Sequence, residues 1–123
     1  MGIIHKNYFL TITGLNHYYG MKPIEIGRIL TLVKDKNNEH DEEAIAVLLP
    51  YIEIIGYVAN SPNTVVKGTY SAGRIYDLFQ EEAYAQVLFA TKDSVICVLI
   101  LSEDLVDLME DFKEGDPINR KLN

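Results

Sequence analysis

The sequence predicts a mainly β fold: a partly open barrel of six strands with short helices and an amphipathic helix near its C-terminal end. Apolar runs with strand character recur along the chain, and Gly, Pro, Asn and Asp residues mark the turns between them. Helical spacing of apolar residues occurs in only two places. With 123 residues, the chain is long enough to bury one core and is expected to form one domain.

The six predicted strands cover residues 8–15, 29–33, 44–49, 52–58, 83–90 and 95–101. The first strand alternates between apolar and polar positions, as in a half-buried strand, and ends at a turn glycine. Pro50 ends the third strand. Gly56 lies inside the fourth strand, where a glycine indicates a bulge or the close approach of another backbone. A turn around Lys92 and Asp93 joins the last two strands.

The first helical segment is predicted over residues 72–80. Ser71 is a candidate N-cap for it, and its apolar face consists of Ile75, Leu78 and Phe79.

The second helical segment follows Ser102 and has an apolar stripe of Leu105, Leu108, Met109 and Phe112. Gly115 and Pro117 mark its end. We expect residues 1–101 to form the barrel, and residues 102–123 to form an acidic helix and tail of the same domain.

The net charge of −7 is concentrated near the C-terminal end. Residues 1–74 contain seven basic and seven acidic side chains, whereas residues 75–123 contain four basic and eleven acidic ones. An acidic surface repels the nucleic-acid backbone, so this charge argues against a strong grip on long duplex DNA. The neutral N-terminal part of the chain permits modest, local binding.

The single cysteine, Cys97, lies in an apolar run and is expected to be buried. One cysteine forms no disulfide framework, which fits a reducing compartment. The N-terminal residues have no signal-peptide pattern, and the apolar run at residues 95–101 is far shorter than the roughly 18 residues that span a bilayer. We therefore expect a cytoplasmic protein without a membrane partner.

Three segments carry the residues with functional chemistry. The loop at residues 35–43 contains Asn37, Asn38, His40 and Asp41, residues 14–20 read GLNHYYG, and residues 55–61 read IGYVANS. Asparagine offers the donors and acceptors that match a base edge, while Asp41 can accept a hydrogen bond from a hydroxyl group. Tyrosine rings stack on bases, which contributes about 1–3 kcal/mol per base.

In their order and spacing these segments resemble the HIRAN domain, over roughly residues 8–101. HIRAN domains occur fused to helicase-like DNA-repair proteins and as standalone bacterial proteins, and this chain resembles the standalone type. The resemblance implies an OB-like barrel, which agrees with the strand pattern, and a nucleic-acid-binding role. It further implies recognition of single-stranded DNA, with a free 3′ end as the preferred feature.

The resulting nucleic-acid-binding residues are His17, Tyr18, Tyr19, Lys36, Asn37, Asn38, His40 and Asp41. With the end recognition that the resemblance implies, we expect Tyr18 or Tyr19 to stack on the terminal base, the asparagines to hold its edge or phosphate, and Asp41 to accept a hydrogen bond from the terminal hydroxyl. Lys34 and Lys36 flank the loop and are candidates for phosphate contacts. Such a module has no turnover of its own and would position a separately encoded helicase or nuclease.

Two positions depart from the residues usual in this family. His17 stands where the better-known eukaryotic members have arginine, so a charge-assisted phosphate contact is weaker or depends on pH. His40 stands where tyrosine is more usual and offers a smaller ring. If the tyrosine pair is extended, one ring faces a ligand and the other packs inward.

Each of these residues also has a structural interpretation. Asn and Asp side chains shape loops by bonding to their own backbone, the tyrosines can cover the barrel end, and surface lysines are ordinarily solvated.

Catalysis, metal ions and cofactors have little support in the sequence. The three histidines, His5, His17 and His40, show no metal-binding spacing, and one cysteine cannot complete a zinc finger. No GxxxxGK[ST] phosphate loop is present. His40 and Asp41 are neighbours on one loop, and no nucleophile is paired with them. We therefore expect a protein that is not an enzyme and has no cofactor.

Two alternatives remain open. The apolar stripe of the C-terminal helix favours a protein–protein interaction domain of this fold with little or no DNA affinity, if the barrel closes without that helix. The acidic side chains of the same helix suggest a DNA mimic that folds over the domain's own site. No pattern in the sequence specifies the oligomeric state.

Overall fold

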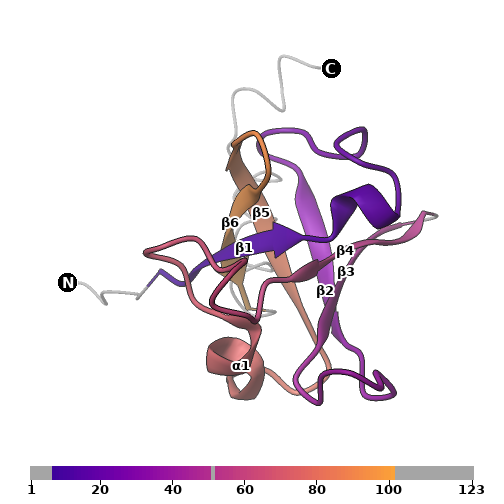
Figure 1. The fold of residues 1–123 in the computed structure, drawn as a ribbon, viewed down its shortest axis with the longest axis vertical. Coiled ribbons are helices and arrows are strands. Elements are labelled where there is room, and N and C mark those ends of the chain that lie inside the picture. Colours follow the sequence, from indigo (N-terminus) through magenta and orange to yellow (C-terminus); the bar gives the residue numbers. More distant parts are fainter. Residues whose placement is uncertain (1–6, 51, 102–123) are drawn as a thin grey trace, which may run out of the picture.

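The computed structural model describes residues 7–50 and 52–101, which form a closed, antiparallel six-stranded barrel (Figure 1). The strands are β1 (Phe9–Thr13), β2 (Ile29–Lys34), β3 (Ile45–Leu49), β4 (Glu53–Val58), β5 (Glu82–Ala90) and β6 (Val95–Ile100). Around the barrel they follow the order β1-β4-β3-β2-β5-β6, and β6 pairs with β1. All six predicted strands are confirmed, with ends that differ by at most two residues.

The prediction of a partly open barrel is wrong, because the structure closes it at a short seam between β1 and β4. In this seam Ile12 lies opposite Val58, and Thr13 lies opposite Tyr57. On its other side, β1 pairs with β6 over residues 9–12. Periodicity specifies each strand, but closure depends on the stagger and curvature of the whole sheet, which a strand-by-strand analysis does not contain.

A bulge in β4 and a glycine make this seam possible. Val47 pairs with Gly56 and Leu48 pairs with Ile54, so Ile55 is an extra residue in β4. The bulge leaves both Ile55 and Gly56 buried. A Cβ atom at position 56 would lie 2.8 Å from the carbonyl oxygen of Thr13. The bulge and the close approach predicted at Gly56 are both confirmed.

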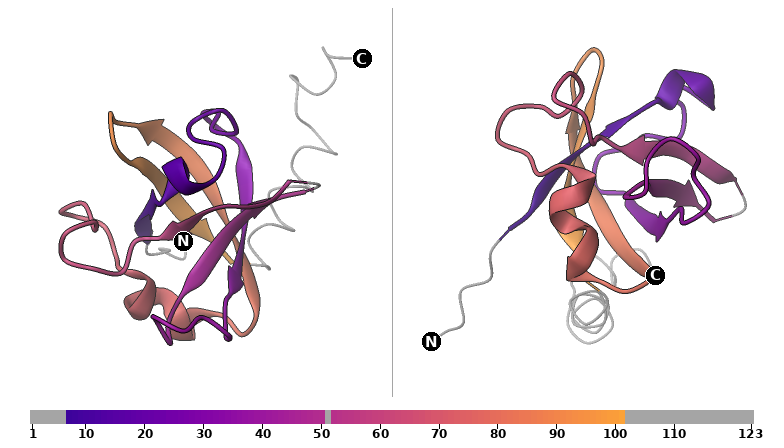
Figure 2. Two further views of the ribbon diagram at one scale, coloured as in Figure 1. Left: turned by 45° about the vertical axis from the view of Figure 1, so that its right-hand side comes forward. Right: turned by 60° about the horizontal axis from the view of Figure 1, so that its bottom comes forward.

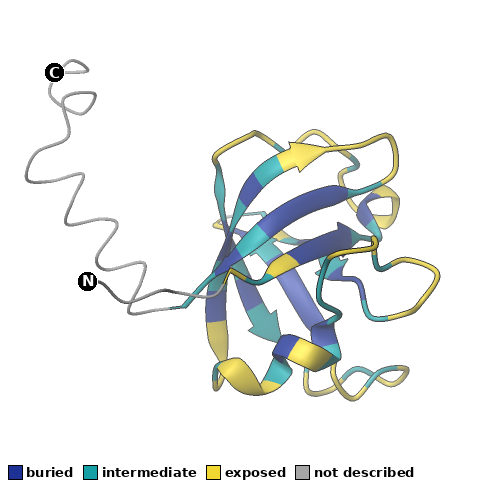
Figure 3. Ribbon diagram, turned by 90° about the vertical axis from the view of Figure 1, so that its left-hand side faces the viewer, coloured by how far each residue is buried: buried dark blue, intermediate teal, exposed yellow. Residues whose placement is uncertain are grey.

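The core fills the barrel with aliphatic side chains (Figure 3). Buried positions alternate with more exposed ones along β2 and β5, whereas β1, β3 and β6 each contain three consecutive buried residues. Its fully buried large members include Leu10, Ile12, Leu30, Leu32, Ile45, Ile55 and Ile75. Cys97 is also completely buried, as predicted. Burial raises the pKa of its thiol to about 12.

The predicted helix over residues 72–80 is shorter than expected. It consists of α1 (Ala72–Ile75) and a 3-10 turn, η2 (Tyr76–Leu78). Ser71 occupies the N-cap position, but its side chain makes no capping hydrogen bond. Ile75 is buried, whereas Leu78 is 37% exposed, so the predicted apolar face is only partly covered.

A second 3-10 turn, η1 (Leu15–His17), follows β1 and lies well apart from α1 (Figure 2). The predicted C-terminal helix and tail lie outside the described residues. Within the described part of the chain, no helix is long and apolar enough to cross a membrane.

Replacing Gly56 with alanine is expected to destabilise the barrel. The added methyl group would collide with the Thr13 carbonyl oxygen and would lie 3.1 Å from Ile12 Cγ2. Overpacking of this kind costs about 1–3 kcal/mol. Urea denaturation followed by circular dichroism measures the change in the free energy of unfolding. A loss below about 0.5 kcal/mol, the range of neutral surface substitutions, would contradict the close approach.

Because the Cys97 thiol is buried, we expect the protein to lose stability at alkaline pH. Its pKa is about 12 in the folded protein against an ordinary value of 9.0, so between these values the unfolded chain binds fewer protons. The free energy of unfolding therefore falls as pH rises through this window, by up to about 1.4 kcal/mol per pH unit, and is unaffected by the thiol below it. Denaturation of the native protein and Cys97→Ala at pH 8 to 11 tests this, and equal slopes would contradict it.

Candidate nucleic-acid interface

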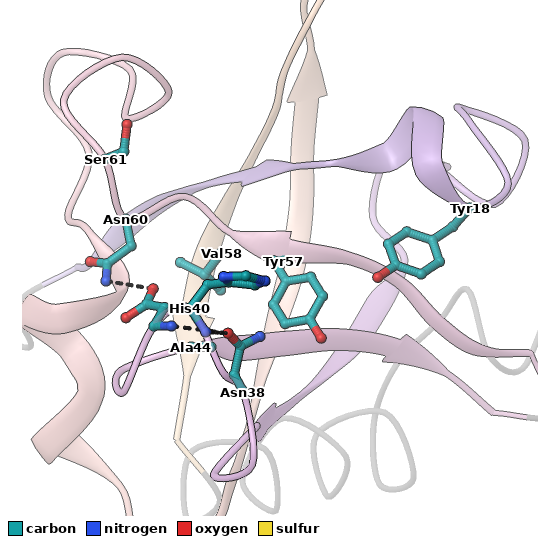
Figure 4. A pocket seen from close by; sticks show the side chains of 9 residues that line it. Tyr18, Asn38, His40, Ala44, Tyr57, Val58, Asn60 and Ser61 are labelled. Carbon is teal, nitrogen blue, oxygen red and sulfur yellow. Dashed lines mark hydrogen bonds between the residues drawn. The ribbon is translucent and has the colours of Figure 1, made fainter.

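A pocket of about 560 Å³ lies on the surface where three segments of the chain meet (Figure 4). Tyr18 follows η1, the loop between β2 and β3 supplies four residues, and β4 with the residues after it supplies the rest. The lining consists of Tyr18, Asn38, His40, Asp41, Ala44, Tyr57, Val58, Asn60 and Ser61. The structure thus brings together at one place the three segments that the sequence analysis singled out.

Asn38 shapes the loop between β2 and β3. Its Oδ1 atom accepts hydrogen bonds from the backbone N–H groups of His40 and Asp41, at 2.9 and 3.0 Å. Its Nδ2 atom donates to Asp35 Oδ2 at 3.3 Å. Because these bonds occupy the side-chain oxygen and one amide proton, Asn38 has a loop-shaping role and one amide proton left for a ligand.

Asp41 is held in place from two directions. Its Oδ1 atom accepts a hydrogen bond from the Glu43 N–H group, and its Oδ2 atom accepts one from Asn60 Nδ2, both at 2.9 Å. Asn60 is itself fixed, because its Oδ1 atom accepts a hydrogen bond from the Gly73 N–H group at 2.8 Å. Each carboxylate oxygen can accept a further hydrogen bond. Asp41 is therefore positioned at the pocket with acceptor capacity to spare.

Two tyrosine rings form an aromatic wall. The centroids of the Tyr18 and Tyr57 rings are 6.4 Å apart, and the ring planes are tilted by 40°. The Tyr57 hydroxyl donates a hydrogen bond to Asp35 Oδ2 at 2.7 Å. Partial burial and this carboxylate raise the pKa of Tyr57 well above its ordinary value, so the hydroxyl stays a neutral donor. Figure 4 shows the His40 ring on the other side of Tyr57 from Tyr18.

Four of the eight predicted site residues line this pocket: Tyr18, Asn38, His40 and Asp41. The sequence analysis did not single out Tyr57 and Asn60, although both belong to the IGYVANS segment that carries part of the family resemblance. Their roles depend on partners far away in the sequence, Asp35 and Asp41.

The other four predicted residues lie elsewhere. His17 lines a neighbouring hollow, and Asn37 is exposed on the loop outside the pocket. Tyr18 and Tyr19 are 43% and 52% exposed, so neither packs inward as expected of one member of an extended pair. The reason is that the segment turns instead of extending, with the Gly20 N–H group bonded to the Leu15 carbonyl oxygen at 2.8 Å.

The two lysines beside the loop already have partners within the protein. Lys36 Nζ lies 2.6 Å from Glu81 Oε2, and this hydrogen bond raises the pKa of Lys36 and lowers that of Glu81. Lys34 Nζ lies 4.1 Å from the ring centroid of Tyr76. A phosphate contact by Lys36 would have to compete with Glu81.

Acidic residues are frequent beside the pocket, but they are not arranged as a metal site. Across residues 7–50 and 52–101, no group of three or more His, Cys, Asp or Glu side chains could hold a metal ion. The arrangement instead offers aromatic surface, one positioned carboxylate and a few amide donors, which is the chemistry of binding.

Comparisons with known proteins bear on the family and the fold. The sequence model of the HIRAN domain matches residues 5–81. A crystal structure of a protein from Lactobacillus plantarum shares the fold, with 20% sequence identity, a TM-score of 0.53, and coverage of 76% of this chain and 93% of that one. A search of curated proteins found no match.

The HIRAN domain of human HLTF is similarly related, with 18% identity, a TM-score of 0.53 and coverage of 89% of each chain. At these identities the two structures support the fold alone, whereas the HIRAN match extends over more than half of the sequence. This match shows that the chain belongs to the HIRAN domain family, and the closed barrel and the pocket where its three motif segments meet are consistent with that assignment.

Proposed function

We propose that this protein is a non-catalytic module that binds the end of single-stranded DNA, with a preference for a free 3′ end. Membership of the HIRAN domain family supports the coarser role of a nucleic-acid-binding module. The observation that carries the finer proposal is a pocket with aromatic rings and a positioned carboxylate in its lining. Its volume of about 560 Å³ lies in the range of pockets that hold small organic ligands, which suits one terminal nucleotide.

The terminal base stacks on Tyr18 in this proposal. The Tyr18 side chain is 43% exposed, so a face of its ring is accessible to a base. Tyr57 stands beside it and is anchored by its hydrogen bond to Asp35. Stacking accepts any of the four bases, so the proposal includes no sequence preference.

Asp41 recognises the end of the strand. Its carboxylate can accept a hydrogen bond but donates none, so it requires a donor from the ligand. In a DNA strand the 3′-hydroxyl is such a donor and occurs only at the end. A 3′-phosphate would instead place negative charge beside the carboxylate, while the nearby Lys36 is already paired with Glu81.

The module has no chemical step of its own. Its use would be to hold a strand end while a separately encoded helicase or nuclease acts on the DNA. Because Lys34 and Lys36 are engaged with other side chains, few phosphate contacts are available, and the expected affinity is modest.

A second candidate function is suggested by a separate apolar hollow of about 250 Å³, lined in part by Phe9, Val66 and Phe89. Phe89 is 50% exposed, which favours a protein–protein interaction surface. This candidate predicts no strand binding at about 100 μM protein, where a binding free energy of roughly −5.5 kcal/mol would be detected. It also predicts that Phe89→Ser weakens a protein complex without altering the pocket at Tyr18.

The end preference is tested by fluorescence anisotropy at low salt with one labelled strand in three forms. We expect the free 3′-hydroxyl form to bind more tightly than the 3′-phosphate form, and an end closed by a hairpin to bind least. Asp41→Asn keeps the shape but removes the charge, so it should bring the affinities for hydroxyl and phosphate ends closer together. Equal binding of all three forms by the native protein would contradict end recognition.

The stacking role is tested with two neighbouring tyrosines. Tyr18→Ala is expected to weaken binding by about 1–3 kcal/mol, which is roughly 5-fold to 150-fold. Tyr19→Ala is the matched control, because Tyr19 is exposed but does not line the pocket, and it should change the affinity less than about twofold. Thermal unfolding checks that both variants fold. Similar losses in both variants would contradict the assignment to Tyr18.

A further inference from the structure

We propose that a second hollow, next to the end-binding pocket, receives the phosphodiester group of the adjoining nucleotide, and that Lys92 supplies its positive charge. This inference rests on the proposed function and extends the path of the strand beyond the terminal nucleotide. The hollow has a volume of about 280 Å³ and lies between the segment after β1 and the turn that joins β5 to β6. Asn16, His17 and Lys92 are the side chains in its lining with nitrogen donors.

The two sites adjoin each other at the barrel seam. Thr13 lines the second hollow and is the pairing partner of Tyr57, which lines the first. Residues opposite each other in antiparallel strands have Cα atoms about 4.5–5.5 Å apart. His17 and Tyr18 are also consecutive residues, one in each site. In Figure 2 (left), η1 and the β5–β6 turn lie toward the same end of the barrel.

Lys92 differs from most basic side chains of the described residues in having no ion pair or ring contact with any of those residues. Among the described residues, four of the seven lysines and arginines have partners: Arg28 with Glu25, Lys36 with Glu81, Lys34 with Tyr76, and Arg74 with Tyr70. Lys22, Lys67 and Lys92 have no ion pair or ring contact within the described part of the chain. Of these three, only Lys92 lines a hollow that adjoins the end-binding pocket.

The donors in this hollow fit a phosphodiester, which carries one negative charge and accepts hydrogen bonds. Lys92 is exposed at a turn, so it can approach a phosphate without giving up packing in the core. The Asn16 amide and one imidazole nitrogen of His17 can donate to the same group. Asp93 also lines the hollow and opposes an anion, which limits the site to a weak contact with a single phosphate.

The salt dependence of binding tests this inference. With the 3′-hydroxyl strand, Lys92→Gln should weaken binding and reduce the slope of log K against log salt by about 0.7, the value for one phosphate contact in a single strand. Lys67→Gln is the matched control, because Lys67 is exposed and has no ion pair or ring contact within the described residues, but lies in the separate hollow near Phe89. It should leave affinity and slope unchanged.

A second measurement identifies which phosphodiester group of the strand contacts Lys92. Replacing the linkage next to the terminal nucleotide with an uncharged methylphosphonate should weaken binding by the native protein and should cause little further loss in Lys92→Gln. If Lys92→Gln binds strand ends with the native affinity and salt slope, the assignment of Lys92 is wrong, whereas the proposed end-binding function stands. Absence of strand binding by the native protein would overturn both the inference and the proposed function.

Discussion

The arrangement of this protein depends on the close approach of the β1 backbone to Gly56. The Thr13 carbonyl oxygen lies 2.8 Å from where a Cβ atom at position 56 would stand, so the short β1–β4 seam is favoured by the absence of a side chain there. The seam closes the barrel and brings η1, which follows β1, into contact with β4. Tyr18 consequently stands beside Tyr57, and a surface hollow arises between segments that are distant in the sequence. Barrel closure and the candidate site thus have the same physical origin.

The polar side chains of the site form a network that ties the loop between β2 and β3 to the rest of the barrel. Asp35 accepts hydrogen bonds from Tyr57 and Asn38, and Asp41 accepts one from Asn60. Both carboxylates are therefore fixed by donors from neighbouring segments. Within the described residues, no buried side-chain nitrogen or oxygen lacks a hydrogen-bond partner. The loop has a defined shape although it contains mostly polar residues.

Much of the fold could be predicted from local patterns. The alternation of residues 8–15, the stop at Pro50 and the glycine inside the fourth strand indicate the strands and the bulge that the structure contains. Barrel closure could not be predicted in this way, because it depends on how the first strand meets the fourth. The same limit applies to α1, where a helical spacing suited to a longer helix ends after one turn.

The candidate site was predictable as three segments but not as a set of contacts. The motif order identified the segments that meet at the pocket, whereas the roles of Tyr57 and Asn60 depend on partners 22 and 19 residues away. Lys36 illustrates the same point, because the fold pairs it with Glu81, 45 residues away. The sequence shows that Lys36 flanks a loop, but it does not show which carboxylate the fold places beside this lysine.

The network around Asp41 has a consequence for the entropy of binding. Fixing a side chain or a loop on binding opposes association, and a site that is already ordered avoids that loss. Here the loop is held by its own side chain to backbone bonds, and Asn60 and Gly73 hold the carboxylate from the far side. A ligand therefore meets a preorganised surface, and the freedom lost on association belongs mainly to the ligand. Preorganisation gives a small surface with few basic side chains a way to bind with few contacts.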